Sequence, residues 1–227
     1  MKYHPNPDLL LRYSAGSLEP AVAFSVAVHL KLCTSCQAQY AELESLGGDL
    51  IESMEDAPIQ QKGFDNLMDK LMEQGNQPAL ELAIDEAINT ANEYFDEQSA
   101  IASSYLPLLN DLTRSDYSAI GWSKVGSKMA RSSIDMLDGQ NKIELLKFKP
   151  GAKIPQHTHR GNEYTVILDG DYTDEIGTFK RGDFIHMTAD NHHQPIAGKQ
   201  GCICLAVTDA PMKFTGALGP VLNWFTS

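Results

Sequence analysis

The chain has 227 residues, 42% of them hydrophobic, which is enough for one large domain or two small ones with cores of their own. Its formal net charge of -12 disfavours direct binding to nucleic acid or anionic lipid, whose phosphates it would repel. No apolar run approaches the roughly 20 residues of a membrane span. The first residues reach Pro5, Pro7 and Asp8 without an apolar segment of signal-peptide length. We therefore expect a cytoplasmic protein whose four cysteines are metal ligands or core residues rather than disulfides.

The N-terminal third has the apolar spacing and capping residues of helices. Asn6 can cap the first helix and Gly16 can end it, while Val22, Val26 and Leu30 give the second helix one buried stripe. The expected helices cover residues 6–15, 17–32, 34–51 and 65–73. Residues 1–75 are therefore predicted to form a small all-α, four-helix domain.

The composition and the spacing of apolar residues change after residue 75. Residues 76–105 are acidic and rich in Ala and Glu, and we interpret them as a linker, with helix as the alternative. From residue 106, short apolar runs alternate with Gly, Asp and Asn turns; these runs are KIELLKF, EYTVILDG, DFIHM and CICLAV. Such a pattern indicates an antiparallel sheet folded as a sandwich or barrel over residues 106–227. The predicted fold class is α+β multidomain, with an all-α domain followed by an all-β domain.

A first group of potential metal ligands lies in "VAVHLKLCTSCQAQ". His29 and Cys33 are four residues apart and share one helix face, and Cys36 follows across a turn. Zinc prefers such sulfur and nitrogen ligands in a tetrahedral arrangement. A structural site needs a fourth ligand, and His4 is the remaining histidine or cysteine of the first domain. Closed coordination by four side chains leaves no place for a substrate, so this zinc site is expected to be structural or regulatory.

Two alternatives compete with the zinc interpretation. The first is a buried histidine with two core cysteines, but Lys31, Thr34 and Ser35 make the surroundings polar. The second is a thioredoxin-like redox pair, which would require the CxxC to lie in a βαβ unit rather than between helices. The zinc hypothesis therefore accounts for the pattern best.

An HxxxCxxC motif with an upstream histidine is the signature of zinc-binding anti-sigma domains. The segments "HPNPDLLLRYSAGSL", "VAVHLKLCTSCQAQ" and "LGGDLIE" resemble the ChrR type of anti-sigma factor. The resemblance implies a four-helix unit that binds a group IV (extracytoplasmic-function, ECF) sigma factor and blocks its access to core RNA polymerase. A domain this small leaves some apolar side chains exposed for a partner. The candidates are Leu9, Leu10, Phe24, Val28 and Leu67, although core packing is favoured for any one of them.

A second group of ligands lies in "GAKIPQHTHRGNEYTVILDG". His157 and His159 alternate along a strand and face the same side, and Glu163 starts the next strand after a turn. The spacing resembles the first cupin motif throughout. The second cupin motif would fall in "GDFIHMTADNHHQP", where Thr188 and Asp190 replace its usual proline and glycine. The register makes His193 the last ligand, with His192 as the alternative.

Three histidines and a carboxylate suit Zn, Mn, Fe or Ni, while a metal-free cupin with a polar pocket is the alternative. Other polar residues of this half have ordinary explanations. His186 is expected at the surface or in the core, and Cys202 and Cys204 in the core, with redox sensing as a minor option. The residues that could orient a substrate are Lys147, Lys149, Tyr164 and Tyr172.

ChrR-type proteins pair the helical domain with a cupin-like domain in this order, so the resemblance extends over nearly the whole chain. It implies a double-stranded β-helix (jelly-roll) barrel that senses oxidative stress, such as singlet oxygen or organic hydroperoxide, and triggers release of the sigma factor. We therefore expect a regulator of transcription rather than an enzyme. The alternative is a metal-dependent cupin enzyme, similar to a dioxygenase, with a fused zinc-binding interaction domain.

Overall fold

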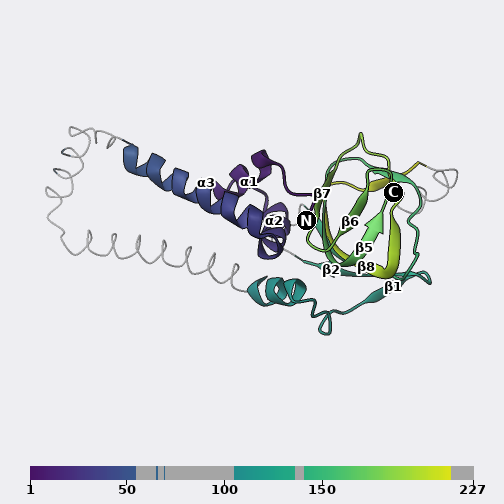
Figure 1. Ribbon diagram of the computed structural model, residues 1–227. Helices are drawn as coiled ribbons and strands as arrows, with labels where there is room; N and C mark the ends of the chain where they lie inside the picture. Colours follow the sequence, from purple (N-terminus) through teal and green to yellow (C-terminus); the bar gives the residue numbers. More distant parts are fainter. Residues whose placement is uncertain (55–64, 66–68, 70–104, 136–140, 216–227) are drawn as a thin grey trace. The chain divides into compact units, whose positions relative to one another are not determined.

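The computed structural model describes residues 1–54, 65, 69, 105–135 and 141–215 (Figure 1). The expected helix at 65–73, Leu67, and nearly all of the linker at 76–105 lie outside the described residues. The chain divides into two compact units. The first consists of Met1–Gly47 together with Leu109–Ser227, and the second of Gly48–Leu108. The first unit therefore contains both expected metal sites.

Helix α1 (Pro7–Ser14) has the ends that its sequence predicts. The side chain of Asn6 accepts a hydrogen bond from the backbone N–H of Leu9 at 2.7 Å, and Pro7 occupies the first turn. Gly16 follows the helix with a φ of 62°, a left-handed conformation that glycine adopts without strain. The N–H of Ser17 then bonds back to the carbonyl of Arg12 at 2.9 Å, which closes the helix.

Helix α2 (Pro20–Leu32) starts three residues later than expected, because Ser17 belongs to the turn that closes α1. Its burial also extends beyond the single predicted stripe: Phe24, Ser25 and Val28 are buried as well as Val22 and Val26. An apolar helix that is buried nearly all round lies between other elements. One side of α2 packs against α1, and the helix also contacts strands β5 (Glu163–Thr173) and β8 (Ile196–Thr208).

Helix α3 (Thr34–Ser53) begins directly after Cys33, whose extended backbone ends α2. Cys36 is its one buried side chain. The C-terminal half of α3 carries large apolar side chains that are more than half exposed, namely Leu46, Leu50 and Ile51, followed by Met54 just beyond the helix. Among the described residues no single helix is long and apolar enough to cross a membrane; α2 and α3 pass such a test only as a pair, bent by 118°.

The second half of the chain is a set of antiparallel strands, as the sequence predicts. A seven-stranded sheet has the order β1-β2-β3-β8-β5-β6, with β7 also paired to β5, and β4 pairs with β9 in a second sheet. The remaining bounds are β1 (Ser123–Val125), β2 (Met129–Ile134), β3 (Lys142–Phe148), β4 (His157–His159), β6 (Thr178–Lys180), β7 (Phe184–Met187) and β9 (Met212–Phe214). Residues 105–113, at the start of this half, are helical.

The core of the barrel lies between these strands. Phe148, Ile167, Tyr172 and Phe179 belong to one buried cluster. Cys202 and Cys204 are free thiols in the same cluster, which agrees with core packing as their expected role. Where β5 passes β8, a Cβ on Gly170 would lie 2.1 Å from the carbonyl oxygen of Gly201, so the two strands approach closely only because this position is glycine.

Candidate metal centres

The first candidate centre gathers at the junction of α2 and α3. The ligand atoms of His4, His29, Cys33 and Cys36 all lie within 4.8 Å of one another. The Nδ1 atom of His4 is 3.4 Å from Cys33 Sγ and 3.3 Å from Cys36 Sγ, and the Nε2 atom of His29 is 3.3 Å from Cys36 Sγ. Ligands at about 2.0 to 2.3 Å from one tetrahedral zinc ion would have separations of this size. The donor set and its spacing therefore fit zinc.

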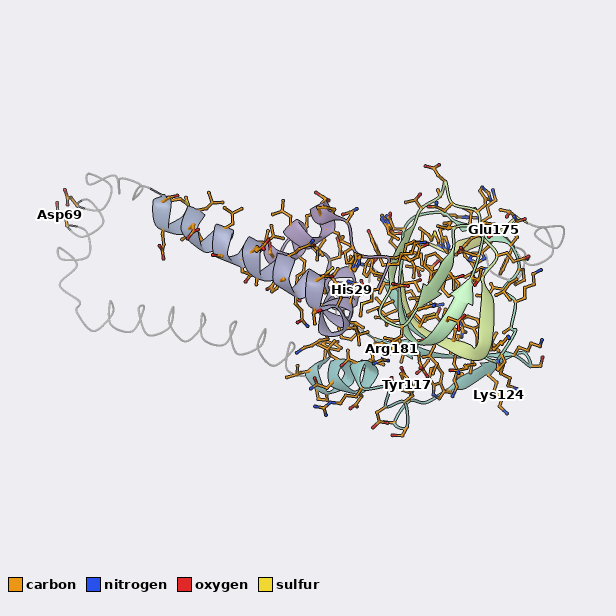
Figure 2. The ribbon with its side chains drawn as sticks, in the orientation of Figure 1. His29, Asp69, Tyr117, Lys124, Glu175 and Arg181 are labelled. Atoms are coloured by element: carbon orange, nitrogen blue, oxygen red, sulfur yellow. The ribbon has the colours of Figure 1, made fainter. Side chains whose placement is uncertain are left out.

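His29, labelled in Figure 2, is fully buried and contacts the turn that precedes β7. Its Nδ1 lies 2.7 Å from the carbonyl oxygen of Gly182, in the turn between β6 and β7. With the proton on Nδ1, the ring donates to this carbonyl and leaves Nε2 free to face Cys36. Such an outer partner fixes the tautomer and the orientation of a metal-binding imidazole. The barrel thus supplies a supporting contact for a site whose four ligands all belong to the N-terminal segment.

The same turn also holds the N-terminal arm that carries His4. The buried carboxylate of Asp183 accepts hydrogen bonds through Oδ1 from the backbone N–H groups of Lys2 at 2.8 Å and Tyr3 at 3.2 Å. The N–H of Phe184 donates to the carbonyl of Tyr3 at 3.0 Å. His4 is therefore positioned by contacts between its arm and the residues at the start of β7.

The protonation states at this centre determine how its affinity for a divalent cation depends on pH. Burial is the main cause that lowers the pKa of His29 to about 4, so the ring is neutral at pH 7. Burial and the neighbouring Cys33 raise the pKa of Cys36 to about 12. For Cys33 burial acts in the same direction, but hydrogen bonds from Ser35 and Cys36 outweigh it and lower the pKa. Zinc binding would then displace a proton from Cys36, so acid should weaken it.

The second candidate centre lies inside the barrel. The ligand atoms of His157, His159, Glu163 and His193 lie within 4.8 Å of one another. His157 and His159 are the two ends of β4, and Glu163 begins β5. Two reciprocal backbone hydrogen bonds, of 3.1 and 3.0 Å, join His157 to His193 and place the loop histidine beside the strand. His192 is exposed and is not part of the group, so the geometry favours His193 over the alternative.

The polar atoms of this group converge on one place inside the barrel. Glu163 Oε2 lies 2.7 Å from His159 Nε2, a distance at which the two form an ion pair when the ring is protonated, and this buried oxygen has no other partner among the described residues. The Nε2 atoms of His159 and His193 are 3.4 Å apart. When the rings are neutral and present Nε2 lone pairs to the carboxylate, that crowding is costly unless something lies between them. A metal ion bound by all four side chains would satisfy them, so the residues fit such an ion.

Outer partners orient two of the three histidines. His157 Nδ1 lies 2.9 Å from the carbonyl oxygen of Pro155, and His193 Nδ1 lies 3.0 Å from Asp174 Oδ2. The side chain of Asp174 is fully buried, and its other oxygen accepts from the N–H groups of Ile176 and Gly177. Both imidazoles therefore carry their proton on Nδ1 and present Nε2 to the centre.

Charge at this centre also favours a cation. Burial, with the nearby His193, lowers the pKa of His157 to about 4. Burial alone would raise the pKa of Glu163, but the adjacent His159 and the other two histidines outweigh it and lower the pKa to about 2. At pH 7 the group therefore has an ionised carboxylate and a neutral His157, which is the protonation state that metal binding requires.

The other polar residues that the sequence singled out in the barrel lie outside the two candidate metal centres. His186 is exposed, stacks on Tyr164 with ring centroids 4.5 Å apart, and contacts Asn162. Tyr172 belongs to the core cluster, and Lys147 and Lys149 are exposed. The described candidates for a partner face are buried, which agrees with core packing as the favoured interpretation; these are Leu9, Leu10, Phe24 and Val28.

Sequence reasoning missed the outer partners Gly182, Asp183 and Asp174. Gly182 and Asp183 begin the segment that resembles the second cupin motif, and the motif predicts no contact with the N-terminal centre. Asp174 lies in "YTDEIG", which has the composition of an ordinary turn. Gly182 and Asp174 contact the ligands His29 and His193, which are 153 and 19 residues away in sequence, and Asp183 contacts Lys2 of the arm that carries His4, which is 181 residues away. Local spacing holds no signal for them.

Known proteins with this combination of features exist. A family model described as the ChrR cupin-like domain matches residues 113–212. The chain is 30% identical to the anti-sigma-E factor ChrR of Cereibacter sphaeroides over 226 residues, which cover 99% of this chain and 98% of ChrR.

A solved structure of Rhodobacter sphaeroides SigE in complex with the anti-sigma ChrR is also similar. The TM-score is 0.65 at 27% identity, with 92% of this chain and 99% of the matched chain covered. The similarity thus spans both candidate centres and the segments between them. From its sequence, its fold and these similarities, the chain belongs to the ChrR family of anti-sigma factors.

Proposed function

We propose that this protein binds a group IV (ECF) sigma factor in the cytoplasm and withholds it from RNA polymerase. The observation that carries the proposal is the cluster of His4, His29, Cys33 and Cys36 in a chain that is similar over nearly its full length to ChrR, which was solved in complex with SigE. The proposal assigns sigma binding to residues 1–75 and sensing to residues 106–227, joined by the acidic linker at 76–105.

The zinc site has a structural role in this proposal. Zinc would supply four strong bonds that hold together the N-terminal arm, the end of α2 and the start of α3. Cys36 is the one buried side chain of α3. The other contacts of α3 with the preceding helices include a 2.6 Å hydrogen bond from Gln37 Nε2 to the carbonyl of Leu30 and the Tyr13–Tyr40 ring contact. Binding of the four ligands to one ion would add to these contacts and fix the direction in which α3 leaves α2. The zinc site therefore sets the geometry of the surface that the sigma factor contacts.

That surface includes the exposed apolar side chains of α3 in this proposal. Leu46, Leu50 and Ile51 are 53%, 59% and 72% exposed, whereas α2 buries most of its large apolar residues. Clusters of exposed apolar side chains mark sites of protein association. A sigma factor, as the partner, would remove these side chains from water.

The cupin centre would hold the regulatory metal, with zinc preferred and Mn, Fe or Ni as alternatives. Oxidation at this centre, by singlet oxygen or organic hydroperoxide, is the proposed signal. The contacts of Gly182, Asp183 and Phe184 with His29 and with the arm support a route between the centres. From this turn β7 runs to Met187, which is paired with the ligand Glu163. A shift of Glu163 would thus be transmitted along β7 to the zinc site.

The test is co-expression with a candidate group IV sigma factor, followed by purification through a tag on the sigma factor. We expect a one-to-one complex with the unaltered chain and its loss in Cys33→Ser/Cys36→Ser. His192→Gln changes an exposed histidine outside both centres and is the matched control, which should retain the complex. A double variant that still co-purifies in full amount would contradict the proposed role of zinc.

The alternative of a metal-dependent cupin enzyme stays a prediction with a separate test. Turnover of a small oxygenated substrate by the full chain, lost in Glu163→Gln but not in Cys33→Ser, would favour it. The anti-sigma proposal expects no such turnover, because the buried ligands serve to hold a sensing metal in place.

A further inference from the structure

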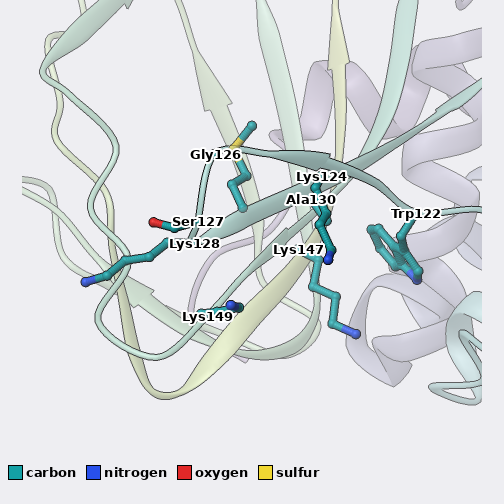
Figure 3. Close-up of a pocket in the computed structure, with 9 residues that line it drawn as sticks. Trp122, Lys124, Gly126, Ser127, Lys128, Ala130, Lys147 and Lys149 are labelled. Atoms are coloured by element: carbon teal, nitrogen blue, oxygen red, sulfur yellow. The ribbon is translucent and has the colours of Figure 1, made fainter.

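A pocket on the outer side of the barrel has a composition unlike the rest of this acidic protein. It has a volume of about 470 Å³ and is bordered by Trp122 and four lysines, Lys124, Lys128, Lys147 and Lys149, with no carboxylate among the residues that line it. Figure 3 shows Trp122 on one side of it, near Lys124 and Lys147, and Lys128 and Lys149 on the other. The pocket is separate from both candidate metal centres.

The strand register explains why the lysines gather. Lys124 of β1 and Lys147 of β3 are both paired with Ala130 of β2, so the small side chain lies between two long ones on the same face. Adjacent strands are about 4.8 Å apart, so the two lysine stems leave the sheet about 10 Å from each other. The backbone N–H of Lys149 donates to the carbonyl of Lys128 at 2.9 Å, which places the other two lysines side by side. Alternation and register thus concentrate four positive charges around Ala130.

These charges have no counter-charge in the part of the chain that the structure describes. None of the four lysines forms an ion pair there. The nearest carboxylate of β3 is Glu144, which is three residues from Lys147, on the opposite face, and pairs with Arg131 and Lys142. Like charges held close together destabilise a folded protein unless an anion offsets them. In a chain of net charge -12, a group of four ammonium ions that has no ion-pair partner among the described residues is suited to an anionic ligand.

Trp122 indicates what kind of anionic ligand the pocket would bind. The Nζ atom of Lys147 lies 5.4 Å from the centre of the Trp122 ring, so a cation and an indole line the same wall. Indole rings stack with planar aromatic groups, and lysines bind phosphate groups as point charges. A cavity of this volume is in the range of small-molecule sites. We propose that this pocket binds a soluble phosphorylated molecule with a planar aromatic group, of the kind that a nucleoside di- or triphosphate represents.

The test is titration of the full-length, metal-loaded protein with ATP, with tryptophan fluorescence as the readout. The chain has two tryptophans, Trp122 and Trp224, so Trp122→Phe isolates the signal of the pocket. We expect saturable quenching that Trp122→Phe abolishes, and binding to ATP at least about tenfold tighter than to inorganic pyrophosphate or adenosine alone. Metal content is measured after each titration, so that removal of metal by ATP is not taken for binding.

A charge-matched pair of variants makes the test specific. Lys128→Gln/Lys147→Gln should weaken ATP binding at least about tenfold, whereas Lys153→Gln/Lys180→Gln, which removes two exposed lysines elsewhere, should change it less than about twofold. Equal losses in the two pairs would overturn the proposal, because they would indicate attraction to net charge alone. The proposal also fails if ATP gives no saturable signal, or if polyglutamate binds through these lysines and ATP does not.

Discussion

Asp174 is not a metal ligand, but it orients the ligand His193 for metal binding. Its carboxylate is fully buried, accepts two backbone N–H groups through one oxygen, and lies 3.0 Å from His193 Nδ1 through the other. This arrangement fixes both the rotation of His193 and the nitrogen that faces the centre. It also explains why His193 occupies the group while the adjacent His192 remains exposed.

We predict that Asp174→Asn lowers the affinity of the cupin centre for its metal by about 10- to 100-fold, the usual effect of losing an outer carboxylate. Competition with a chromophoric chelator measures it. The control is Glu175→Gln, because the neighbouring Glu175 contacts the backbone of Gln194 and no ligand side chain. Unchanged metal affinity in Asp174→Asn would show that His193 is oriented in another way.

At the scale of residues, sequence spacing was informative about ligands and silent about their partners. His29, Cys33 and Cys36 share a short segment, so their proximity follows from helical periodicity. His4 could be named only because the N-terminal segment holds no other histidine or cysteine. Gly182 and Asp174 come from distant turns, and nothing in their local sequence distinguishes them from ordinary turn residues.

At the scale of elements, the turn between β6 and β7 links two regions that the sequence treats as separate. Asp183 accepts the N–H groups of Lys2 and Tyr3 through one oxygen and that of Lys180 through the other. The arm that carries His4 is thus held by this buried carboxylate together with the hydrogen bond from the N–H of Phe184 to the carbonyl of Tyr3.

We predict that Asp183→Ala releases the arm and speeds the loss of zinc from the N-terminal centre. Three backbone N–H groups lose their acceptor, at a cost of about 1 to 3 kcal/mol for each one that stays buried. Zinc transfer to a chelator, with thermal unfolding in parallel, measures both effects. Asp190→Ala, an exposed aspartate of the next loop, is the control. Equal zinc release from the two variants would contradict the role of the turn.

Helix α3 gives the second prediction at this scale. Leu50→Ser/Ile51→Ser removes two exposed apolar side chains and should lower sigma affinity at least about tenfold, because burial of such side chains contributes about 1.5 to 3 kcal/mol each. Zinc content should stay the same. Ile176→Ser, at an exposed site in the barrel, is the control for loss of an apolar side chain. Calorimetry measures the affinity for the sigma factor. Equal affinities in the two variants would place the sigma-binding surface elsewhere.

The elements themselves were predictable to different degrees. The ends of α1 follow from Asn6, Pro7 and Gly16, and the four apolar runs became β3, β5, β7 and β8. The start of α2 was placed too early, because Ser17 serves the closing turn of α1. Strand β4 follows from the alternation of His157 and His159, whereas the short strands β1, β6 and β9 are not predictable, since three residues carry no periodic pattern.

At the scale of the whole molecule, the N-terminal helices and the barrel share one compact unit, Met1–Gly47 with Leu109–Ser227. Composition changes along the chain suggested the division into domains, but they carry no information on which surfaces pack together. The burial of α2 against β5 and β8 is the physical reason that Phe24 and Val28 are unavailable to a partner. The barrel therefore contacts the N-terminal candidate centre directly, through Gly182 and Asp183.

The most direct measurement of the central claim is transcription in vitro by RNA polymerase with a group IV sigma factor that co-purifies with this protein. We predict that the full chain inhibits transcription at a ratio near one to one, that Cys33→Ser/Cys36→Ser does not inhibit, and that His192→Gln inhibits as the unaltered chain does. Full inhibition by the double cysteine variant, or none by the unaltered zinc-loaded protein, would contradict the account.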